Sequence, residues 1–482
     1  MNKMIVPAVM IVALAGCATS PQRTFSAPEL AAWTTPQADD EGAVVLDWWR
    51  AFNDPALDRL VERALVRNAD LRAASANLMA ADALAGEARA VARPLGEATA
   101  RLARTRTAGL SQPPILGTPD RLPTQTLADV GAALSWEIDL FGGLSASIEA
   151  ARADAEEALW LRRQIEATVA ASVVRAWLDY RSLAGLEETA QQRIAMLESV
   201  ETRLRSAEGH GGASQADVTQ ATTVLETARE DLPRLSSAKR NAARRLAVLT
   251  GDAPVAEAPF TGPLTIPQTL TAGNPTEMIR RRPDVGAAER RFAAAAARAG
   301  VARADLYPRI RLTGSAGLTA APGRLGDQGA LGFGFGPAIS WGVFDLDRIR
   351  ARLIAADAGA DASMAEWEGT VLAALEEADA ALDGWASQRA SAAASRRALG
   401  DAERSIVFVE AQQRHGLVSS LDLSRAKVDA LSARAATLQA EADEARAWVA
   451  AQLALGAGWR DIGLRAQDSP AQAPGQESGF GD

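Results

Sequence analysis

The sequence predicts a mainly α-helical protein of two tandem repeats, in which four β-strands contribute to a membrane β-barrel. Three observations support this fold class. The 482-residue chain is rich in alanine and has only 5% aromatic residues, a composition typical of long helices. Its two halves match each other at a nearly constant offset. Each half also contains short segments in which apolar residues alternate with small or polar ones.

The N-terminus has the features of a secretory signal peptide. Residues 1–16 contain a lysine, then an apolar stretch, then small residues. The stretch from Leu14 to Cys17, the only cysteine, resembles a bacterial lipobox, which implies that Cys17 is acylated after cleavage. Ala18 follows where an inner-membrane retention signal usually has Asp, and this favours the outer membrane. We expect residues 17–47 to form a lipid-anchored tether.

The two halves of the chain resemble each other over most of their length. Residues 210–217 match residues 415–422, which is an offset of 205. Further upstream the offset is 214, as the pair Pro94 and Pro308 illustrates. The difference of nine residues falls between positions 110 and 130, inside the first predicted hairpin loop. Two copies of one unit therefore make up the chain.

Domain boundaries follow from this match. The first repeat is predicted over residues 48–251 and the second over residues 275–460, with a linker at residues 252–274. Residues 461–482 are rich in Pro, Gly and Gln and are predicted to be a disordered tail.

Each repeat begins with a predicted helix and continues with a β-hairpin. The helices, residues 54–93 and 275–306, stop at a proline. After the second helix, residues 309–318 are a predicted strand, and residues 331–343 alternate large apolar residues with Gly, Ala or Ser. Residues 130–138 show the same alternation more weakly. A half-buried strand of a soluble sandwich is the alternative, but no second sheet is predicted on which it could pack.

Long helices are predicted after each hairpin. In the first repeat we expect them at residues 143–182, 186–207 and 214–249. Helical turns are expected near residues 180–186 and, in the second repeat, near residues 382–389. Such long, alanine-rich helices favour side-by-side packing in a cylinder wall.

The last helix of each repeat begins with a predicted capping box. Ser214 with Asp217, and the equivalent Ser419 with Asp422, have the required spacing. The two histidines, His210 and His415, precede these boxes beside glycines. We expect them to have a structural role in the turn, and no metal site is predicted. 

Two hairpins give four strands, which are too few to close a barrel, and an open sheet edge cannot lie in lipid. Bacterial barrels begin at about eight strands, and side chains fill a barrel of that size. Three copies would supply twelve strands and leave a bore. The sequence therefore predicts a homotrimer.

Composition also excludes some classes of function. The net charge of −9 disfavours a nucleic-acid partner, because such proteins concentrate basic residues on one face. The sequence contains no nucleophile–base pair, no Gly-rich phosphate loop and no cluster of metal ligands. We therefore expect neither an enzyme nor a bound cofactor.

Five segments in order carry a family resemblance, namely residues 48–55, 136–143, 281–308, 336–341 and 455–459. They resemble the TolC-type outer-membrane efflux channels, in particular the NodT-like lipoproteins of resistance–nodulation–division (RND) pumps. The resemblance implies a trimer with a 12-stranded barrel in the outer membrane and an α-helical barrel in the periplasm. It further implies a passive exit duct for drugs or other small toxic compounds, working with a periplasmic adaptor and an inner-membrane RND pump.

The resemblance also suggests functional residues. It implies that the two predicted helical turns form the periplasmic tips of the channel. Asp179 and Asp383 lie there and are candidates for a gate, because three-fold symmetry would turn each into a ring of carboxylates; the alternative is that both are solvated helix charges. Trp136 and Trp341 are candidates for aromatic residues at the membrane interface, with core packing as the alternative.

Other functions stay open at this stage. Type I protein secretion and metal efflux use similar ducts, so the cargo is not fixed by the sequence. A lipoprotein scaffold with coiled-coil arms and no pore is an alternative of another class, although the alternating strands argue against it.

Overall fold

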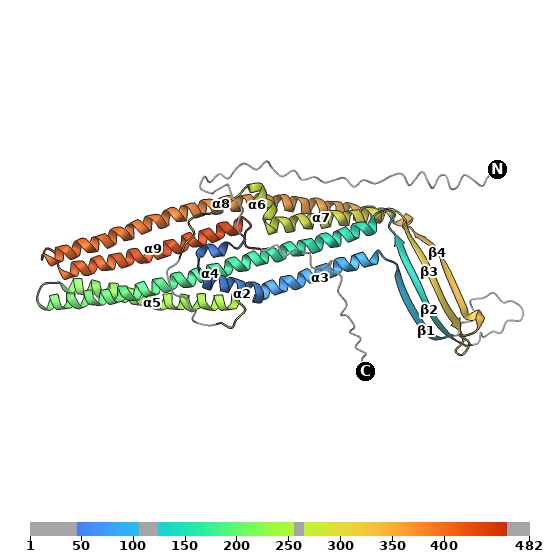
Figure 1. Cartoon of the computed structure of the whole chain (residues 1–482), viewed down its shortest axis with the longest axis horizontal. Coiled ribbons are helices and arrows are strands. Elements are labelled where there is room, and N and C mark those ends of the chain that lie inside the picture. Colours follow the sequence, from blue (N-terminus) through green and yellow to red (C-terminus); the bar gives the residue numbers. More distant parts are fainter. Residues whose placement is uncertain (1–45, 106–123, 255–264, 460–482) are drawn as a thin grey trace, which may run out of the picture. The chain divides into compact units, whose positions relative to one another are not determined.

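The computed structural model describes residues 46–105, 124–254 and 265–459 (Figure 1). The predicted signal peptide, Cys17, most of the tether, the first hairpin loop and the C-terminal tail lie outside these residues. Within them the chain forms two compact units. Among the described residues, one unit contains residues 73–161 and 284–374, and the other contains residues 46–72, 162–283 and 375–459.

Most of the described residues are helical. The first half contains the short 3-10 helix η2 (Trp48–Phe52), α2 (Pro55–Arg67), α3 (Ala69–Val91), β1 (Leu95–Thr105), β2 (Gln125–Ile138), α4 (Gly143–Gly209) and α5 (Gln215–Leu249). The second half contains α6 (Pro275–Arg281), α7 (Pro283–Ala304), β3 (Arg309–Ala320), η4 (Gln328–Ala330), β4 (Leu331–Ser340), η5 (Val343–Asp345), α8 (Leu346–Arg414) and α9 (Ser420–Ala454). The predicted fold class, mainly α with four strands per chain, is confirmed.

The first predicted helix of each repeat is in fact two helices. Between α2 and α3 the chain is extended at Asn68, whose Oδ1 accepts hydrogen bonds from the backbone N–H of Asp70 (2.9 Å) and Leu71 (3.2 Å). Between α6 and α7 it is extended at Arg282, because the ring of Pro283 disfavours a helical residue before it. Both breaks come from local chemistry that the helical periodicity concealed.

The expected turns near residues 180–186 and 382–389 are wrong. Helix α4 continues from Gly143 to Gly209 and α8 from Leu346 to Arg414 without interruption. Gly185 does not end the helix; a Cβ there would lie 3.3 Å from Cδ1 of Leu438 on α9. The glycine therefore allows two helices to approach closely.

The chain reverses direction at later residues. Gly211 and Gly416 have φ angles of 74° and 73°, which favour glycine, and each follows the end of a long helix. The predicted capping boxes are confirmed at the start of α5 and α9, where the side chains of Ser214 and Ser419 accept from the backbone three residues on.

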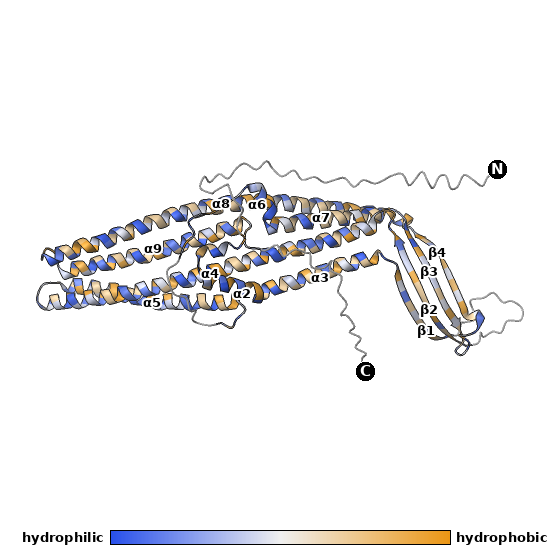
Figure 2. Ribbon diagram, viewed as in Figure 1, coloured by the Kyte–Doolittle hydropathy of each residue, from blue (hydrophilic) through white to orange (hydrophobic). Residues whose placement is uncertain are grey.

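Polar and apolar residues are mixed along the long helices. Figure 2 shows hydrophilic and hydrophobic residues interspersed over α4, α5, α8 and α9. Among the described residues, no helix combines the length and the apolar composition needed to cross a bilayer.

A matching contact fixes the break in each half to the end of a later helix. Asn68 donates from Nδ2 to the carbonyl of Leu249 at 3.0 Å. Arg282 donates from Nη1 to the carbonyl of Ala454 at 2.6 Å. The donors are 214 residues apart and the acceptors 205, the same two offsets that relate the halves of the sequence.

An aromatic cluster forms the core of the second unit. The ring of Phe52 lies edge-on to Trp177 (5.6 Å between centroids) and to Trp448 (5.4 Å). Trp48 also lies edge-on to Trp448 at 5.7 Å. All four rings are buried, so η2 is packed into the helices.

Candidate functional site

The four strands form one antiparallel sheet in the order β1-β2-β3-β4. Neighbouring strands pair without a bulge over their length, so the register assigns every side chain to one of two faces. Within the described residues of a single chain, β1 and β4 are the edges of the sheet.

One face of the sheet is apolar except at the end of the first hairpin, where Arg104 pairs with Thr126. Ile138, Ile310 and Ile339 lie opposite one another on three adjacent strands. Phe333 and Phe335, on the same face, are 78% and 86% exposed in the single chain. The other large apolar residues of this face are Leu102, Val130, Leu134, Trp136, Leu312, Leu318 and Leu331. Such a continuous exposed apolar surface requires an apolar environment.

The opposite face is mostly small or polar. Its middle consists of residues such as Gly131, Ser135, Thr313, Gly317 and Gly336. A Cβ added at Gly131 would lie 3.2 Å from the Cα of Gly317, so the two strands approach closely there. An apolar face and a small or polar face are the two sides of a membrane β-barrel strand, facing lipid and lumen.

Charged residues on the polar face occur near its two ends. Arg311 Nε donates to Glu137 Oε2 at 3.0 Å, close to the helices. Thr319 Oγ1 donates to Asp129 Oδ1 at 2.8 Å, at the other end of the paired segment. Both contacts join β2 to β3 and stabilise the pairing of the two hairpins.

The two tryptophans singled out in the sequence lie where strands meet helices. Trp136 Nε1 donates to the carbonyl of Ala92, and Trp341 Nε1 donates to the carbonyl of Leu306, both at 3.1 Å. The side chains are 39% and 53% exposed, so neither is a core residue of the single chain. Each indole connects the end of a strand to the end of the preceding helix.

The start of α4 is fixed by Asp139, which directly follows β2. Its carboxylate accepts hydrogen bonds from the backbone N–H of Leu144 (3.1 Å) and Ser145 (2.7 Å) and from the Ser145 hydroxyl (2.6 Å). A carboxylate is favourable at this position because the free N–H groups at a helix start carry positive partial charge. The strand and the long helix therefore keep a fixed connection.

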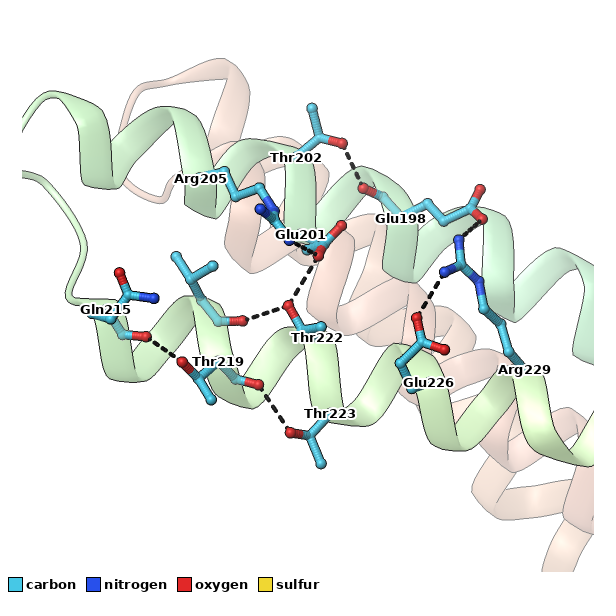
Figure 3. A network of polar contacts seen from close by, with 11 residues as sticks. Glu198, Glu201, Thr202, Arg205, Gln215, Thr219, Thr222, Thr223, Glu226 and Arg229 are labelled. Carbon is cyan, nitrogen blue, oxygen red and sulfur yellow. Dashed lines mark hydrogen bonds and ion pairs between the residues drawn. The ribbon is translucent and has the colours of Figure 1, made fainter.

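A polar network in the second unit holds the C-terminal part of α4 against the N-terminal part of α5 (Figure 3). Arg229 of α5 donates to Glu198 of α4 at 2.6 Å and to Glu226 at 2.8 Å. Thr222 of α5 donates to Glu201 of α4 at 2.9 Å. These exposed and partly buried contacts hold the two helices of this hairpin side by side, close to the chain reversal at Gly211.

The gate candidates Asp179 and Asp383 do not lie at a chain reversal. Each is inside a continuous helix, α4 or α8. Asp179 accepts from Arg446 on α9, with Nε at 2.9 Å and Nη2 at 2.8 Å. The gate hypothesis assumed a turn beside each of these residues, and the structure has a continuous helix at both positions.

A partly buried cross-helix ion pair was not identified from the sequence. Glu187 of α4 accepts hydrogen bonds from Lys239 and Ser236 of α5. Burial acts to raise the pKa of Glu187, but these two hydrogen bonds and the charges of Lys239 and Arg240 together lower the pKa below its usual value. Because the partners are about fifty residues apart in the chain, no local motif indicates the contact.

In the part of the chain that the structure describes, no group of three or more His, Cys, Asp or Glu side chains could hold a metal ion. His210 Nδ1 instead lies 2.7 Å from the carbonyl of Ser206, in the turn after α4. The residues that the structure brings together are therefore those of a membrane sheet and of long helical hairpins.

Comparison with protein families and curated proteins gives consistent matches. The family model described as "Outer membrane efflux protein" matches residues 60–252 and 274–457. The chain is similar to the outer membrane protein OprJ of Pseudomonas aeruginosa, with 31% identity over 92% of this chain and 94% of OprJ. It is also similar to the toluene efflux pump outer membrane protein TtgC of Pseudomonas putida, with 30% identity over 97% of this chain and 98% of TtgC.

A solved structure agrees with these matches. The fold is similar to that of the outer-membrane channel OprN, with a TM-score of 0.81 and 32% sequence identity. The match covers 90% of this chain and 98% of that channel.

Proposed function

The chain belongs to the outer membrane efflux protein family, and we propose that three copies of it form the exit duct of a tripartite efflux system. As a member of this family it is an outer-membrane component of an efflux system and a transport protein. Our proposal adds the trimer, its partners, its cargo and its lipid anchor.

The exposed apolar face of the sheet is the observation that carries the proposal. In the single chain, Phe333, Phe335 and Leu102 are 69–86% exposed, a state that water disfavours and lipid tails favour. The opposite face offers Gly, Ser and Thr to a water-filled lumen. An open sheet edge is not tolerated in lipid, so the four strands must be completed by further copies. Three copies supply twelve strands, enough for a bore.

The proposed partners are a periplasmic adaptor and an inner-membrane RND-type pump. The long hairpins α4–α5 and α8–α9 mix polar and apolar residues along their length, which suits the periplasm (Figure 2). We propose drugs or other small toxic organic compounds as cargo, supported by the similarity to a toluene efflux protein. The duct itself needs no catalytic group, because the pump supplies the energy.

We further propose that Cys17 carries the lipid anchor and that Trp136 and Trp341 lie at the periplasmic interface of the outer membrane. The position of both indoles at the junction of strand and helix supports this. Two repeats, residues 48–251 and 275–460, would place six similar units around the channel axis. The two capping boxes and the two glycine turns, 205 residues apart, support this division.

The mass of the detergent-solubilised protein, measured together with its conductance in a planar bilayer, tests the proposal. A trimeric mass with discrete conductance steps is the expected result. A monomer that neither conducts nor sediments with outer membranes would overturn it, and a coiled-coil scaffold would then account for the helices better.

A further inference from the structure

The two edges of the sheet, β1 and β4, have no strand partner within the described chain. If three copies close one barrel, as proposed above, β4 of each copy must pair with β1 of the next. The repeat offsets and the observed strand pairs together determine which residues of β4 and β1 face each other at this seam between copies.

The two offsets of the sequence repeat relate the strands to one another. Adding 214 to a residue of β1 gives its equivalent in β3, and adding 205 to a residue of β2 gives its equivalent in β4. The observed hairpins test this rule. Leu95 pairs with Ser135, and the rule converts this pair into Arg309 with Ser340, which is the pair that the structure contains. All pairs of the second hairpin follow from the first in the same way.

Side-chain contacts obey the same rule. The hydrogen bond from Trp136 to the carbonyl of Ala92 is converted into one from Trp341 to the carbonyl of Leu306. Both bonds are present, with the same length of 3.1 Å. The two hairpins are therefore equivalent in register and in their attachment to the helices.

The joint between β2 and β3 connects the first repeat to the second inside one chain. The joint between β4 and the next copy's β1 connects a second repeat to a first repeat, so the same rule applies to it. The observed pair Ser135 with Thr313 becomes Ser340 with Thr99. We propose that β4 of one copy pairs antiparallel with β1 of the next copy in this register, with Ser340 directly opposite Thr99.

Side-chain size supports this register where the strands meet the helices. On the apolar face there, large residues of β4 and its end meet small residues of β1: Trp341 faces Ala98 and Ile339 faces Ala100, while Phe335, further along β4, faces Arg104. On the polar face the relation is reversed, and Ala338 of β4 faces Arg101. A slip by one residue would place apolar side chains on the polar face along the whole seam. A slip by two residues keeps the faces, so the experiment must distinguish it.

Cysteine pairs can measure the register. Gly131 and Gly317 approach closely, which identifies their pair as one of the narrow type. Ser135 with Thr313 is four residues along the same strands and is of the same type, with Cα atoms about 4.5 Å apart, within the range for a disulfide. In one chain Ser340 and Thr99 are on opposite edge strands, about 14 Å apart at the usual strand spacing. A disulfide between them can therefore form only between copies.

The test is mild oxidation of the S340C/T99C double variant in outer membranes, followed by a non-reducing denaturing gel. Most of the monomer band should convert into linked dimers and trimers that revert on reduction. S340C and T99C alone, which retain Cys17, control for links through other cysteines. S340C/E97C and S340C/R101C report a slip of two residues in either direction. S135C/T313C, the observed equivalent inside one chain, serves as the positive control for oxidation.

Efficient linking in S340C/E97C or S340C/R101C, and not in S340C/T99C, would show a trimer with a different register. No linking in any of the three while S135C/T313C oxidises would overturn the seam itself. A wild-type mass below that of a trimer would instead contradict the proposed function, so the two failures are distinguishable.

Discussion

The indole ring of Trp160 on α4 occupies the space that a side chain at Gly286 on α7 would need. A Cβ at this position would lie 2.5–2.6 Å from ring atoms of the tryptophan, closer than any real Cβ contact. We expect Gly286→Ala to destabilise the protein by about 1–3 kcal/mol, the usual effect of overpacking. The thermal unfolding midpoint of the detergent-solubilised variant checks this.

Gly369→Ala is the matched control for that substitution. Gly369 is an exposed glycine inside α8, with nothing within 4 Å of the added Cβ. Alanine at this position should stabilise the protein slightly, by about 0.4–1 kcal/mol, because it lowers the conformational entropy of the unfolded chain. Equal midpoints for the two variants would show that the contact with Trp160 is not tight.

Arg282 should be important for stability because it completes the end of a helix. Its guanidinium donates to the carbonyl of Ala454 and to Glu377, both at 2.6 Å, and its side chain is only 8% exposed. Arg282→Ala leaves a buried carbonyl without this donor, and we expect a loss of about 2 kcal/mol in the free energy of unfolding. Arg280→Ala, an exposed neighbour, should change it by less than about 0.5 kcal/mol. Similar losses for both variants in chemical denaturation would contradict the role of the carbonyl contact.

Glu187 should make stability depend on pH in the acid range. Burial acts to raise its pKa, but the hydrogen bonds from Lys239 and Ser236 outweigh it, and the folded-state pKa lies below the ordinary value of 4.5. Because the folded-state pKa is lowered, the ionised carboxylate stabilises the fold above about pH 4.5. This contribution is lost as the pH falls through the folded-state pKa.

The variant Glu187→Gln measures this contribution. At pH 7 its unfolding midpoint should lie below that of the wild type, and the difference should shrink as the pH falls below about 4.5. Glu188→Gln, at an exposed position on the same helix, should show little difference at any pH. A difference for Glu187→Gln that stayed constant down to pH 3 would mean that the ion pair contributes nothing measurable.

Asp179 and Asp383 should be dispensable for closing the channel. Both lie inside uninterrupted helices, and the ion pair of Asp179 with Arg446 is partly exposed, 44% and 32% for the two side chains. Exposed ion pairs contribute about 0–1 kcal/mol. We expect Asp179→Asn and Asp383→Asn to leave bilayer conductance unchanged. A rise in open probability for either variant would restore the gate hypothesis.

Cys17 should be the site of acylation. Cells grown with radioactive palmitate should label the wild-type protein and not Cys17→Ala, because the lipobox-like stretch from Leu14 offers one thiol. Ser20→Ala, three residues further on, should be labelled like the wild type. Label retained in Cys17→Ala would place the lipid on another residue and contradict Cys17 as the site of acylation.

Features encoded by neighbouring residues were predictable from the sequence. The capping boxes at Ser214 and Ser419 need only a hydroxyl and a carboxylate three residues apart, and the structure contains both. The alternation in residues 331–343 indicated a strand, although β4 ends at Ser340 because the chain turns into η5 after Gly342. Periodicity was sufficient for these elements because their cause is local.

Features decided by distant contacts were not predictable. Gly185 looked like a helix end, but it faces Leu438, which is more than 250 residues away in the chain. The expected turn near residues 180–186 failed for this reason, and the gate hypothesis had assumed that turn. The helix break at Asn68 has both kinds of cause, because its Oδ1 caps the next helix locally while its Nδ2 donates to the distant carbonyl of Leu249.

The bare apolar face of the sheet has a consequence for the life of the protein before it functions. A copy that finished folding alone in the periplasm would display Phe333 and Phe335 to water and would adhere to any other unfolded chain. In the proposed trimer, a newly exported chain would therefore need a chaperone, and strand formation would have to coincide with delivery to the bilayer and to two further copies. The order of events in biogenesis is thus constrained by the same side chains that later face lipid.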